Sequence, residues 1–412
     1  MTARSESSFP RAEAATLLLA LAIGAGLLAA SWAALHLPPL DSYQIVDTPV
    51  YQEYGEAIAA GEVPYRDFEL EYPPAALPVF WLPTLGPEQH YGTIFELLML
   101  VCGAAALGFV LLALSALGAP PGRLLAAAVF VGLFPLALGT VVLTRFDLWP
   151  AALAAAALAA LLAGKGRLGV AVLALAVAAK IYPLVLLPPA LLLVWRRRGP
   201  REAAICLGAF VTVLALVVAP FAAVAPDGLL DSLDRQLGRP LQIESLGASL
   251  LLAAKQLGLY DPTVVSTHGS QNLAGTLPDA LATAQTVLQA TAVLAIWALA
   301  ARGPLTPARL ASASAASVVA FVAFGKVLSP QFLIWLVPLV PLVAGRAGVA
   351  AGALLGAALV TTHLWFPRGY WDMVALESEG WLVLARNLAL VALAGVLAVA
   401  TARRGSAAPR SG

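Results

Sequence analysis

The sequence predicts an all-α polytopic membrane protein, a single domain of about twelve membrane segments with a long outward-facing first loop. Three observations support this fold class. Of the 412 residues, 60% are apolar and only 11% are charged, whereas soluble domains carry about 25% charged residues. Apolar runs close to the roughly 20 residues that a spanning helix needs recur along the whole chain. The polar residues gather in a few intervals between those runs.

The apolar runs predict twelve segments, some of them only half the usual length. Their ranges are 15–37, 91–117, 123–143, 147–163, 168–181, 183–195, 202–224, 279–301, 308–325, 330–344, 347–365 and 381–402. The first run is too long for the apolar core of a signal peptide, so we expect it to be a retained span. We expect the whole chain, 1–412, to form one integral membrane domain.

The basic residues predict the orientation. If the N-terminus is cytoplasmic, 15 of the 24 Lys and Arg residues lie in segments on that side, as the positive-inside rule requires. Both termini are then cytoplasmic, with 403–412 as a cytoplasmic tail. The extracytoplasmic loops are 38–90, 225–278 and 366–380.

Two segments are too short for a pair of full spans. Only 28 residues make up 168–195, whereas two crossings need about 40. We therefore expect a hairpin whose tip, Lys180 to Pro183, stops in the outer half of the membrane. The segment 324–335, with Lys326 and Pro330 at its turn, has the same character. A further apolar stretch, Leu246 to Leu259, predicts an interfacial helix.

Ionisable side chains near membrane depth are candidates for function, because burying one there costs roughly 2.5–3.5 kcal/mol. They cluster on the predicted outer side, and they are Arg145, Asp147, Lys180, Lys326, His363 and Arg386. Cationic walls beside a carboxylate suit a substrate that has an anionic phosphate and a hydroxyl to be activated. Structural roles are the alternative: a local ion pair between Arg145 and Asp147, lysines that extend to the interface, and a satisfied interfacial histidine.

The polar interval from Asp41 to Pro83 holds eight carboxylates. Most of its acids fit the wet face of an amphipathic helix from about Tyr51 to Ala60, with Gly61 as its stop. Asp47 lies just before that helix, so it can be an N-terminal cap, a functional carboxylate, or both. Asp67, Glu69 and Glu71 alternate as on one face of an extended segment. No His or Cys cluster has metal-ligand spacing, so we expect no metal site.

Several segments together resemble glycosyltransferase family 87, the polyprenyl-phosphate-mannose-dependent mannosyltransferases of the GT-C superfamily. The similar segments are 46–83, with VDTPVYQEYGEAIAAGEVPYRDFELEYPP; 144–158, with TRFDLWP; 178–193, with AAKIYPLVLLPP; 239–245, with RPLQIES; and 325–339, with GKVLSPQFLIW. The resemblance covers roughly 45 to 340. It implies a GT-C-type multispanning helical fold with short interfacial helices in its first outward loop.

The resemblance also implies which residues form the site. The acid that matches the family's catalytic carboxylate is Asp47. The segment PYRDFELEYPP matches the stretch that shapes the mouth of the cavity. We expect Lys180, Arg145 or Lys326 to bind the donor phosphate. The expected substrate-binding residues are Tyr65, Arg66, Asp67, Glu71, Tyr72, Asp147, Tyr182, Glu244, Ser329, Gln331 and His363.

The expected activity is transfer of a sugar, mannose by resemblance, from a polyprenyl-phosphate donor to a hydroxyl of an extracytoplasmic glycolipid or glycan, with inversion. Asp47 takes the acceptor's proton, and no second carboxylate is needed for an activated phosphate leaving group. The expected place is a bacterial plasma membrane, with membrane lipid around the chain and no cofactor or nucleic-acid partner. A transporter or flippase of lipid-linked sugars is the main alternative, and a non-catalytic membrane partner in envelope assembly is another.

Overall fold

The chain is predominantly helical in a computed structural model that describes residues 11–41, 45–377 and 380–403. Seven of the described helices are long and apolar enough to cross a membrane. They are α1 (Arg11–Ala34), α4 (Tyr91–Ala116), α5 (Pro121–Leu138), α10 (Pro200–Val224), α13 (Thr276–Ala301), α15 (Gly345–Trp365) and α17 (Gly380–Ala402). The predicted multispanning helical fold is confirmed.

The other five predicted segments form helices that are shorter than a full span. They are α7 (Leu148–Leu162), α8 (Gly166–Ala179), η4 (Tyr182–Leu186) with α9 (Leu187–Arg198), α14 (Pro307–Ala323), and η5 (Pro330–Trp335) with η6 (Val340–Leu342). The interior of the bundle explains their composition. Nearly every residue of α14 is buried, and its small serines and alanines let neighbouring backbones approach closely. The number of segments that cross the membrane stays a prediction.

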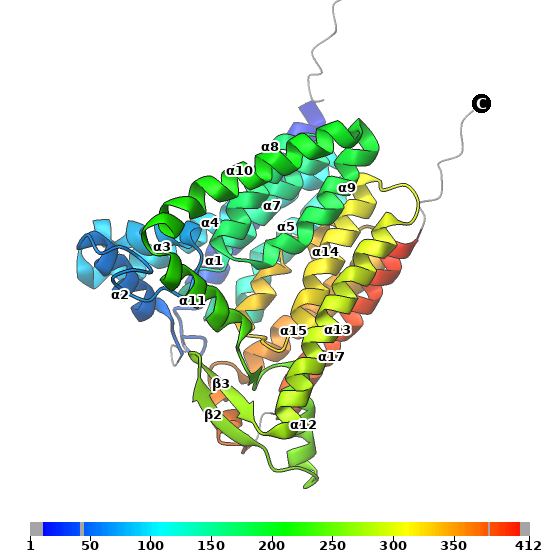
Figure 1. Ribbon diagram of the computed structural model, residues 1–412. Helices are drawn as coiled ribbons and strands as arrows, with labels where there is room; N and C mark the ends of the chain where they lie inside the picture. The colour runs from blue at the N-terminus through cyan, green and yellow to red at the C-terminus, as the bar shows by residue number, and fades with distance from the viewer. Residues whose placement is uncertain (1–10, 42–44, 378–379, 404–412) are drawn as a thin grey trace, which may run out of the picture.

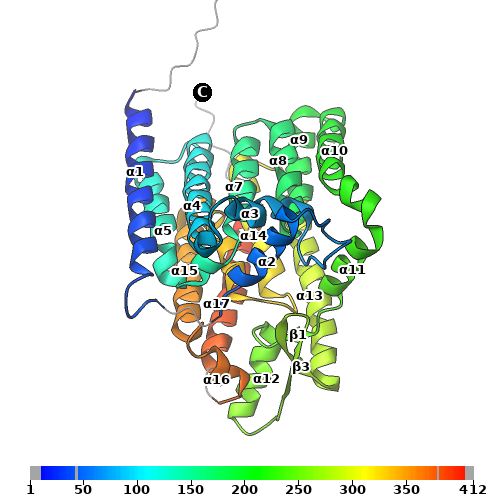
Figure 2. The same cartoon turned by 90° about the vertical axis from the view of Figure 1, so that its left-hand side faces the viewer.

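The helices form one continuous bundle (Figures 1 and 2). Along one edge α1 packs on α5 and α4. Next to them, α4 packs on α7, and α7 packs on α8. Farther along, α8 contacts α10, while α13, α14, α15 and α17 form the remaining part of the bundle. Figure 1 shows the first residues of α1 and the last residues of α17 at the same end. The predicted short hairpin is present, because α8 ends at Ala179 and Lys180 is extended before η4 begins.

Arginines at that end of the bundle donate to backbone carbonyls in and near the ends of helices. Arg309 donates to the carbonyl oxygens of Leu299, Pro304 and Thr401. Arg123 donates to Leu342 O at 2.5 Å. The last carbonyls of a helix have no partner within the helix and carry partial negative charge, so arginine satisfies both needs. The basic residues that predicted the orientation thus also join helix ends to one another.

Short elements of the polar loops lie at the other end of the bundle and beside it. The first loop contains α2 (Thr48–Ala59), η1 (Pro74–Ala76), α3 (Leu77–Trp81), η2 (Leu82–Leu85) and η3 (Glu88–His90). The helix predicted near Tyr51 is therefore confirmed, and it starts three residues earlier; Gly61, at φ 89°, follows its end as expected. The remaining short elements are α6 (Val141–Thr144), α11 (Pro226–Leu237), α12 (Leu246–Gln256) and α16 (Tyr370–Val374).

The second loop also holds a small antiparallel sheet that the all-α prediction missed. Its strands are β1 (Leu241–Gln242), β2 (Thr263–Thr267) and β3 (Ser270–Ala274), in the order β1-β3-β2. His268 and Gly269 join β2 to β3, with φ 53° and 64°. A two-residue turn with both φ values positive is the usual hairpin connection, so TVVSTHGSQNLA carried a signal for it. The stretch predicted as an interfacial helix is α12, which packs on α17.

Candidate active site

Asp47 stands at the start of α2, but its side chain does not cap that helix. Within the described chain its carboxylate accepts no hydrogen bond from the backbone of α2. Instead Asp47 Oδ1 lies 2.7 Å from Arg145 Nη1, and the Tyr51 hydroxyl lies 3.4 Å from Oδ2. The Asp47 side chain is 31% exposed while that of Arg145 is only 5% exposed. The structural alternative, a side-chain cap, is therefore wrong, and the carboxylate faces a buried cation.

Arg145 and Asp147 lie in the turn between α6 and α7, and each pairs with a distant residue. Arg145 pairs with Asp47 from the first loop. Asp147, which is fully buried, accepts from Lys180 Nζ at 2.6 Å and from Trp335 Nε1 at 2.6 Å. The turn therefore ties the first loop to the short hairpin and to η5, which is more than the local ion pair considered from the sequence.

Lys180 sits in an aromatic cage at the tip of the α8–α9 hairpin. Its ammonium lies 4.5 Å from the ring centre of Phe146 and 5.2 Å from that of Trp335. Tyr72 and Phe332 complete the cage at 5.8 Å each. Aromatic faces attract a cation most strongly where water is excluded. Tyr182 is buried beside this cage, with its ring stacked on Trp335 at 4.1 Å.

Glu244, which follows β1, contacts Arg386 and Asn387 of α17. Arg386 Nη2 donates to the Glu244 backbone carbonyl at 2.8 Å, and Asn387 supports the same carbonyl at 3.2 Å. The Glu244 carboxylate accepts from Gln242 Nε2 at 3.0 Å. Burial raises the pKa of Glu244 to about 7, although Arg386 and Arg145 both act to lower it. The carboxylate thus shares an electrostatic environment with both arginines.

Tyr370 of α16 is buried and responds to the charges of Glu244, Arg145 and Asp47. Burial raises the pKa of its phenol above the usual value, and the charges of Glu244 and Asp47 raise it further while Arg145 lowers it. Electrostatic influence falls off with distance. The Tyr370 phenol therefore lies near the side chains of Asp47, Arg145 and Glu244. Arg386 reaches the same region from α17, where its guanidinium lies 5.7 Å from the ring centre of Trp365.

Both arginines have unused donors. Within the part of the chain that the structure describes, Arg145 Nε and Arg386 Nε and Nη1 are buried without a hydrogen-bond partner. The indole N–H of Trp365 is in the same state. A buried donor left without a partner costs about 1–3 kcal/mol, and several together point to an absent acceptor. Phosphate oxygens are well matched to guanidinium donors.

The segment after α14 is attached to β1. Lys326 donates from Nζ to Leu237 O at 2.8 Å, at the end of α11, and its own carbonyl accepts from Gln242 N at 3.0 Å. The Ser329 hydroxyl accepts from Gln242 Nε2 at 3.1 Å. Gln331 is half-buried in η5. Ser329 and Lys326 therefore lie near the Glu244 side of the site, and Lys326 also satisfies the last carbonyl of a helix.

The PYRDFELEYPP segment is divided between a turn and the surface of the loop. Arg66 and Asp67 pair with each other at 2.8 Å, and hydrogen bonds from Arg66 and the Val63 amide lower the pKa of Asp67 to about 2. Tyr65 donates to Tyr72 O at 2.5 Å. Glu71 faces α11 instead. Glu69 also faces α11, through Arg235, so only Asp67 is apart from the other two acids. No group of three or more possible metal ligands gathers in the described residues.

His363, near the end of α15, contacts the end of α5. Its Nδ1 lies 2.9 Å from Leu136 O. Its ring also packs against Gly139, where an added Cβ would lie 2.9 Å from His363 Cδ2. The satisfied structural histidine considered from the sequence fits this arrangement, although a contact of His363 with substrate stays a prediction.

A family model supplies the identity. The model of glycosyltransferase family 87 matches residues 70–330, well over half of the chain. The chain belongs to glycosyltransferase family 87. It is therefore a membrane glycosyltransferase, and the resemblance predicted from the motifs is confirmed. The matched range contains most of the residues described above but begins after Asp47, so the role of Asp47 depends on its geometry.

Two further comparisons add little to the family 87 assignment. The structure of ArnT from Cupriavidus metallidurans bound to undecaprenyl phosphate is similar at a TM-score of 0.47 and 15% identity, over 93% of this chain and 77% of that chain. Similarity at that level carries no argument about this chain. No curated protein sequence matches the chain.

Several residues of the candidate site are not predicted from the sequence as binding residues. The sequence predicts Arg386 as one of the charged groups of the cavity but not as a phosphate ligand, and it gives no role to Trp335, Trp365, Tyr370 or Gln242. Trp335 lies in the motif GKVLSPQFLIW, so the motif offered a signal. Tyr370 and Trp365 lie in a tryptophan- and tyrosine-rich interval that is equally typical of a membrane interface, so their type alone could not separate the two roles.

The buried pair Lys180–Asp147 predicts a large effect on stability. Replacing Lys180 with methionine leaves Asp147 buried with only the Trp335 N–H, and breaking such a pair costs about 3–5 kcal/mol. We expect the midpoint of thermal unfolding in detergent to fall by several degrees. Lys255→Met is the matched control, because its pair with Asp261 is exposed and is worth at most about 1 kcal/mol. Equal midpoints for both variants would show that Lys180 is not structurally important.

Proposed function

We propose that this family 87 member transfers a sugar, mannose by family resemblance, from a polyprenyl-phosphate donor to a hydroxyl of an outward-facing glycolipid or glycan. One observation carries the proposal: the Asp47 carboxylate does not cap α2 and lies beside the buried Arg145, which has an unused donor. A base and an anion site side by side are what displacement of a phosphate by a hydroxyl requires.

The donor phosphate fits best between Arg145 and Arg386. Both guanidinium groups are buried, at 4% and 0% exposure, and both have donors that the described residues leave unused. Lys180 and Lys326 already contact Asp147 and Leu237, so we place the phosphate at the arginines. Direct contact of either lysine with phosphate stays a prediction from the sequence.

The lipid tail has a path along the bundle. A groove of about 660 Å³ runs between α5 and α15 and is lined by side chains such as Phe130, Leu133 and Leu359. Its last residue on α5 is Ala137, two residues before the Gly139 turn that leads to Arg145. A prenyl chain lying in this groove keeps its apolar carbons away from water and its phosphate near the arginines.

The reaction proceeds as a single displacement. The acceptor oxygen forms a bond to the anomeric carbon, its proton goes to Asp47, and the bond from that carbon to the phosphate oxygen breaks with its electrons on the phosphate. Arg145 orients the Asp47 carboxylate and, with Arg386, stabilises the departing phosphate. A single displacement inverts the anomeric centre, so the product sugar has the opposite configuration to the donor.

Purified protein in lipid nanodiscs tests the proposal. We expect it to transfer label from a polyprenyl-phosphate mannose to an extracted bacterial lipid or glycan fraction, as detected by mass spectrometry. Absence of transfer from every polyprenyl-phosphate sugar tried would contradict the proposal. We also propose that the site lies outside a bacterial plasma membrane with both termini in the cytoplasm, so product should form on the outer face of sealed cells.

We expect donor binding to depend on pH through ionisation of the Glu244 carboxyl. Its pKa is about 7, so the carboxyl is mostly neutral at pH 6 and mostly ionised at pH 8. Ionisation adds a negative charge beside the two arginines and competes with the phosphodiester, which is ionised throughout. We expect the KM for donor to rise several-fold between pH 6 and 8 in the native enzyme. The KM of Glu244→Gln should stay nearly constant, and an equal rise in both enzymes would contradict this account.

A further inference from the structure

A polar cleft opens between the first loop, α11 and the turn of the β2–β3 hairpin, apart from the arginine site. Its volume is about 200 Å³. Ten residues line it: Tyr54, Glu69, Leu70, Glu71, Ser232, Arg235, Gln236, Arg239, His268 and Gly269. We propose that this outer cleft is an acceptor subsite that binds one uncharged sugar ring next to the ring that receives the new sugar. The proposal rests on the proposed function and extends it.

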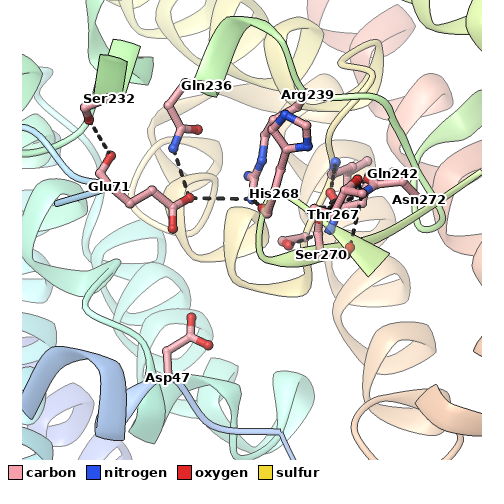
Figure 3. Close-up of polar contacts among 12 residues, drawn as sticks. Asp47, Glu71, Ser232, Gln236, Arg239, Gln242, Thr267, His268, Ser270 and Asn272 are labelled. Atoms are coloured by element: carbon pink, nitrogen blue, oxygen red, sulfur yellow. Dashed lines mark hydrogen bonds and ion pairs between the residues drawn. The ribbon is translucent and has the colours of Figure 1, made fainter. Parts of the chain in front are cut away.

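The groups that line the outer cleft suit hydroxyls. Glu71 accepts from Gln236 Nε2 at 2.9 Å and lies 3.5 Å from Arg239 Nη2. Arg239 also donates to the His268 carbonyl at 2.7 Å (Figure 3). Carboxylate, amide and guanidinium groups side by side offer both acceptors and paired donors, which is what a ring with neighbouring hydroxyls can use.

The charge of the outer cleft favours an uncharged ligand. Glu69 pairs with Arg235 and Glu71 with Arg239, so two acids balance two arginines. A phosphate would meet as much negative as positive charge there. The arginine site differs, because its buried donors lack partners within the described residues. The volume of the outer cleft, about 200 Å³, is also below the roughly 300–1,000 Å³ of pockets for larger ligands. The outer cleft therefore suits a single ring.

The walls of the outer cleft are held in place before any ligand binds. An added Cβ at Gly228 would lie 1.9 Å from the Tyr65 carbonyl oxygen, so α11 packs directly on the first loop. Ser232 Oγ donates to the Glu71 carbonyl at 3.2 Å across the same contact. A preformed site loses little conformational freedom on binding.

One layer of aromatic residues separates the outer cleft from Asp47. Tyr72 follows Glu71, its ring lies 5.9 Å from that of Tyr51, and Tyr51 contacts Asp47. Burial raises the pKa of Tyr72, and the carboxylates of Glu71 and Asp47 raise it further. Figure 3 shows the Asp47 carboxylate turned toward the side on which Glu71 lies. A ring in the outer cleft thus lies one aromatic layer away from Asp47, and an acceptor that occupies both places has at least two rings.

Binding without donor tests the inference separately from transfer. The probes are methyl mannoside and a methyl mannobioside, titrated into the full chain in nanodiscs and followed by saturation-transfer NMR. We expect the disaccharide to bind at least about tenfold more tightly than the monosaccharide. Gln236→Ala and Glu71→Gln should remove about three- to tenfold of that affinity, and Asp231→Asn, on the exposed face of α11, should leave it unchanged.

The outcomes separate the two proposals. Loss of disaccharide affinity in the cleft variants supports the subsite even if no transfer is found. Equal affinity for one ring and two rings, or cleft variants that bind like the native chain, overturns the subsite while leaving the proposed function untouched. In transfer assays Gln236→Ala and Glu71→Gln should raise the KM for the disaccharide acceptor three- to tenfold. Neither variant should change the KM for donor.

Discussion

Replacing Asp47 with asparagine is expected to lower the rate of sugar transfer by about a thousandfold, within the range that a general base contributes. Asparagine keeps the shape of the side chain and can still accept from Arg145, but it cannot take the acceptor's proton at neutral pH. The Asp47 side chain is partly exposed and does not cap α2, and asparagine keeps an acceptor for the buried Arg145, so the variant should lose some stability but still fold. The measurement is initial rate at saturating donor and acceptor.

Glu53→Gln is the matched control for Asp47→Asn. Glu53 lies on α2 as well, two turns or less from Asp47, and is exposed. The same change from carboxylate to amide there should leave the rate within about twofold, since surface substitutions away from special features have small effects. Thermal unfolding of Glu53→Gln should match that of the native chain, while Asp47→Asn should unfold cooperatively at a somewhat lower midpoint. Full activity in a folded Asp47→Asn variant would exclude Asp47 as the base.

Replacing Arg386 with glutamine should raise the KM for donor about 10- to 100-fold. Hydrogen bonds to a charged group contribute about 1.5–3 kcal/mol, which corresponds to that range. Because Arg386 donates to the Glu244 carbonyl, the variant also loses stability. Arg386→Lys keeps the charge with fewer donors, so it should fold better and show an intermediate KM.

Arg123→Gln separates the binding role from the structural one. Arg123 also donates to a backbone carbonyl, Leu342 O, from a half-buried position. It lies at the other end of α5 from the Gly139 turn. We expect this variant to lose stability without any change in the KM for donor. If Arg386→Gln and Arg123→Gln changed the KM equally, Arg386 would have no specific place in donor binding.

Local features of the fold could be predicted from the sequence. Apolar runs predict the helices. Lys165 and Arg196 flank the 28-residue interval 168–195, which is too short for two spans and so predicts the short hairpin that turns at Lys180. The end of α2 before Gly61 follows from the positive φ that glycine adopts easily, and Pro49 suits the first turn of the helix. In each case residues close in sequence decide the conformation.

The partners within the site could not be predicted in the same way. Asp47 and Arg145 are 98 positions apart, and Glu244 and Arg386 are 142 apart. Which cation pairs with which acid depends on how helices pack, and no local pattern encodes it. The sequence therefore predicts that these charges lie on one side, but it offers Lys180, Arg145 and Lys326 equally as phosphate ligands.

The stereochemistry of the product tests the central claim most directly. A polyprenyl-phosphate mannose of known anomeric configuration is supplied to the purified chain, and the one-bond carbon–hydrogen coupling at the new anomeric carbon is measured by NMR. A single displacement assisted by Asp47 predicts the opposite configuration to that of the donor. Retained configuration would mean a covalent intermediate or attack from the face of the departing phosphate, and either would contradict the mechanism derived from Asp47, Arg145 and Arg386.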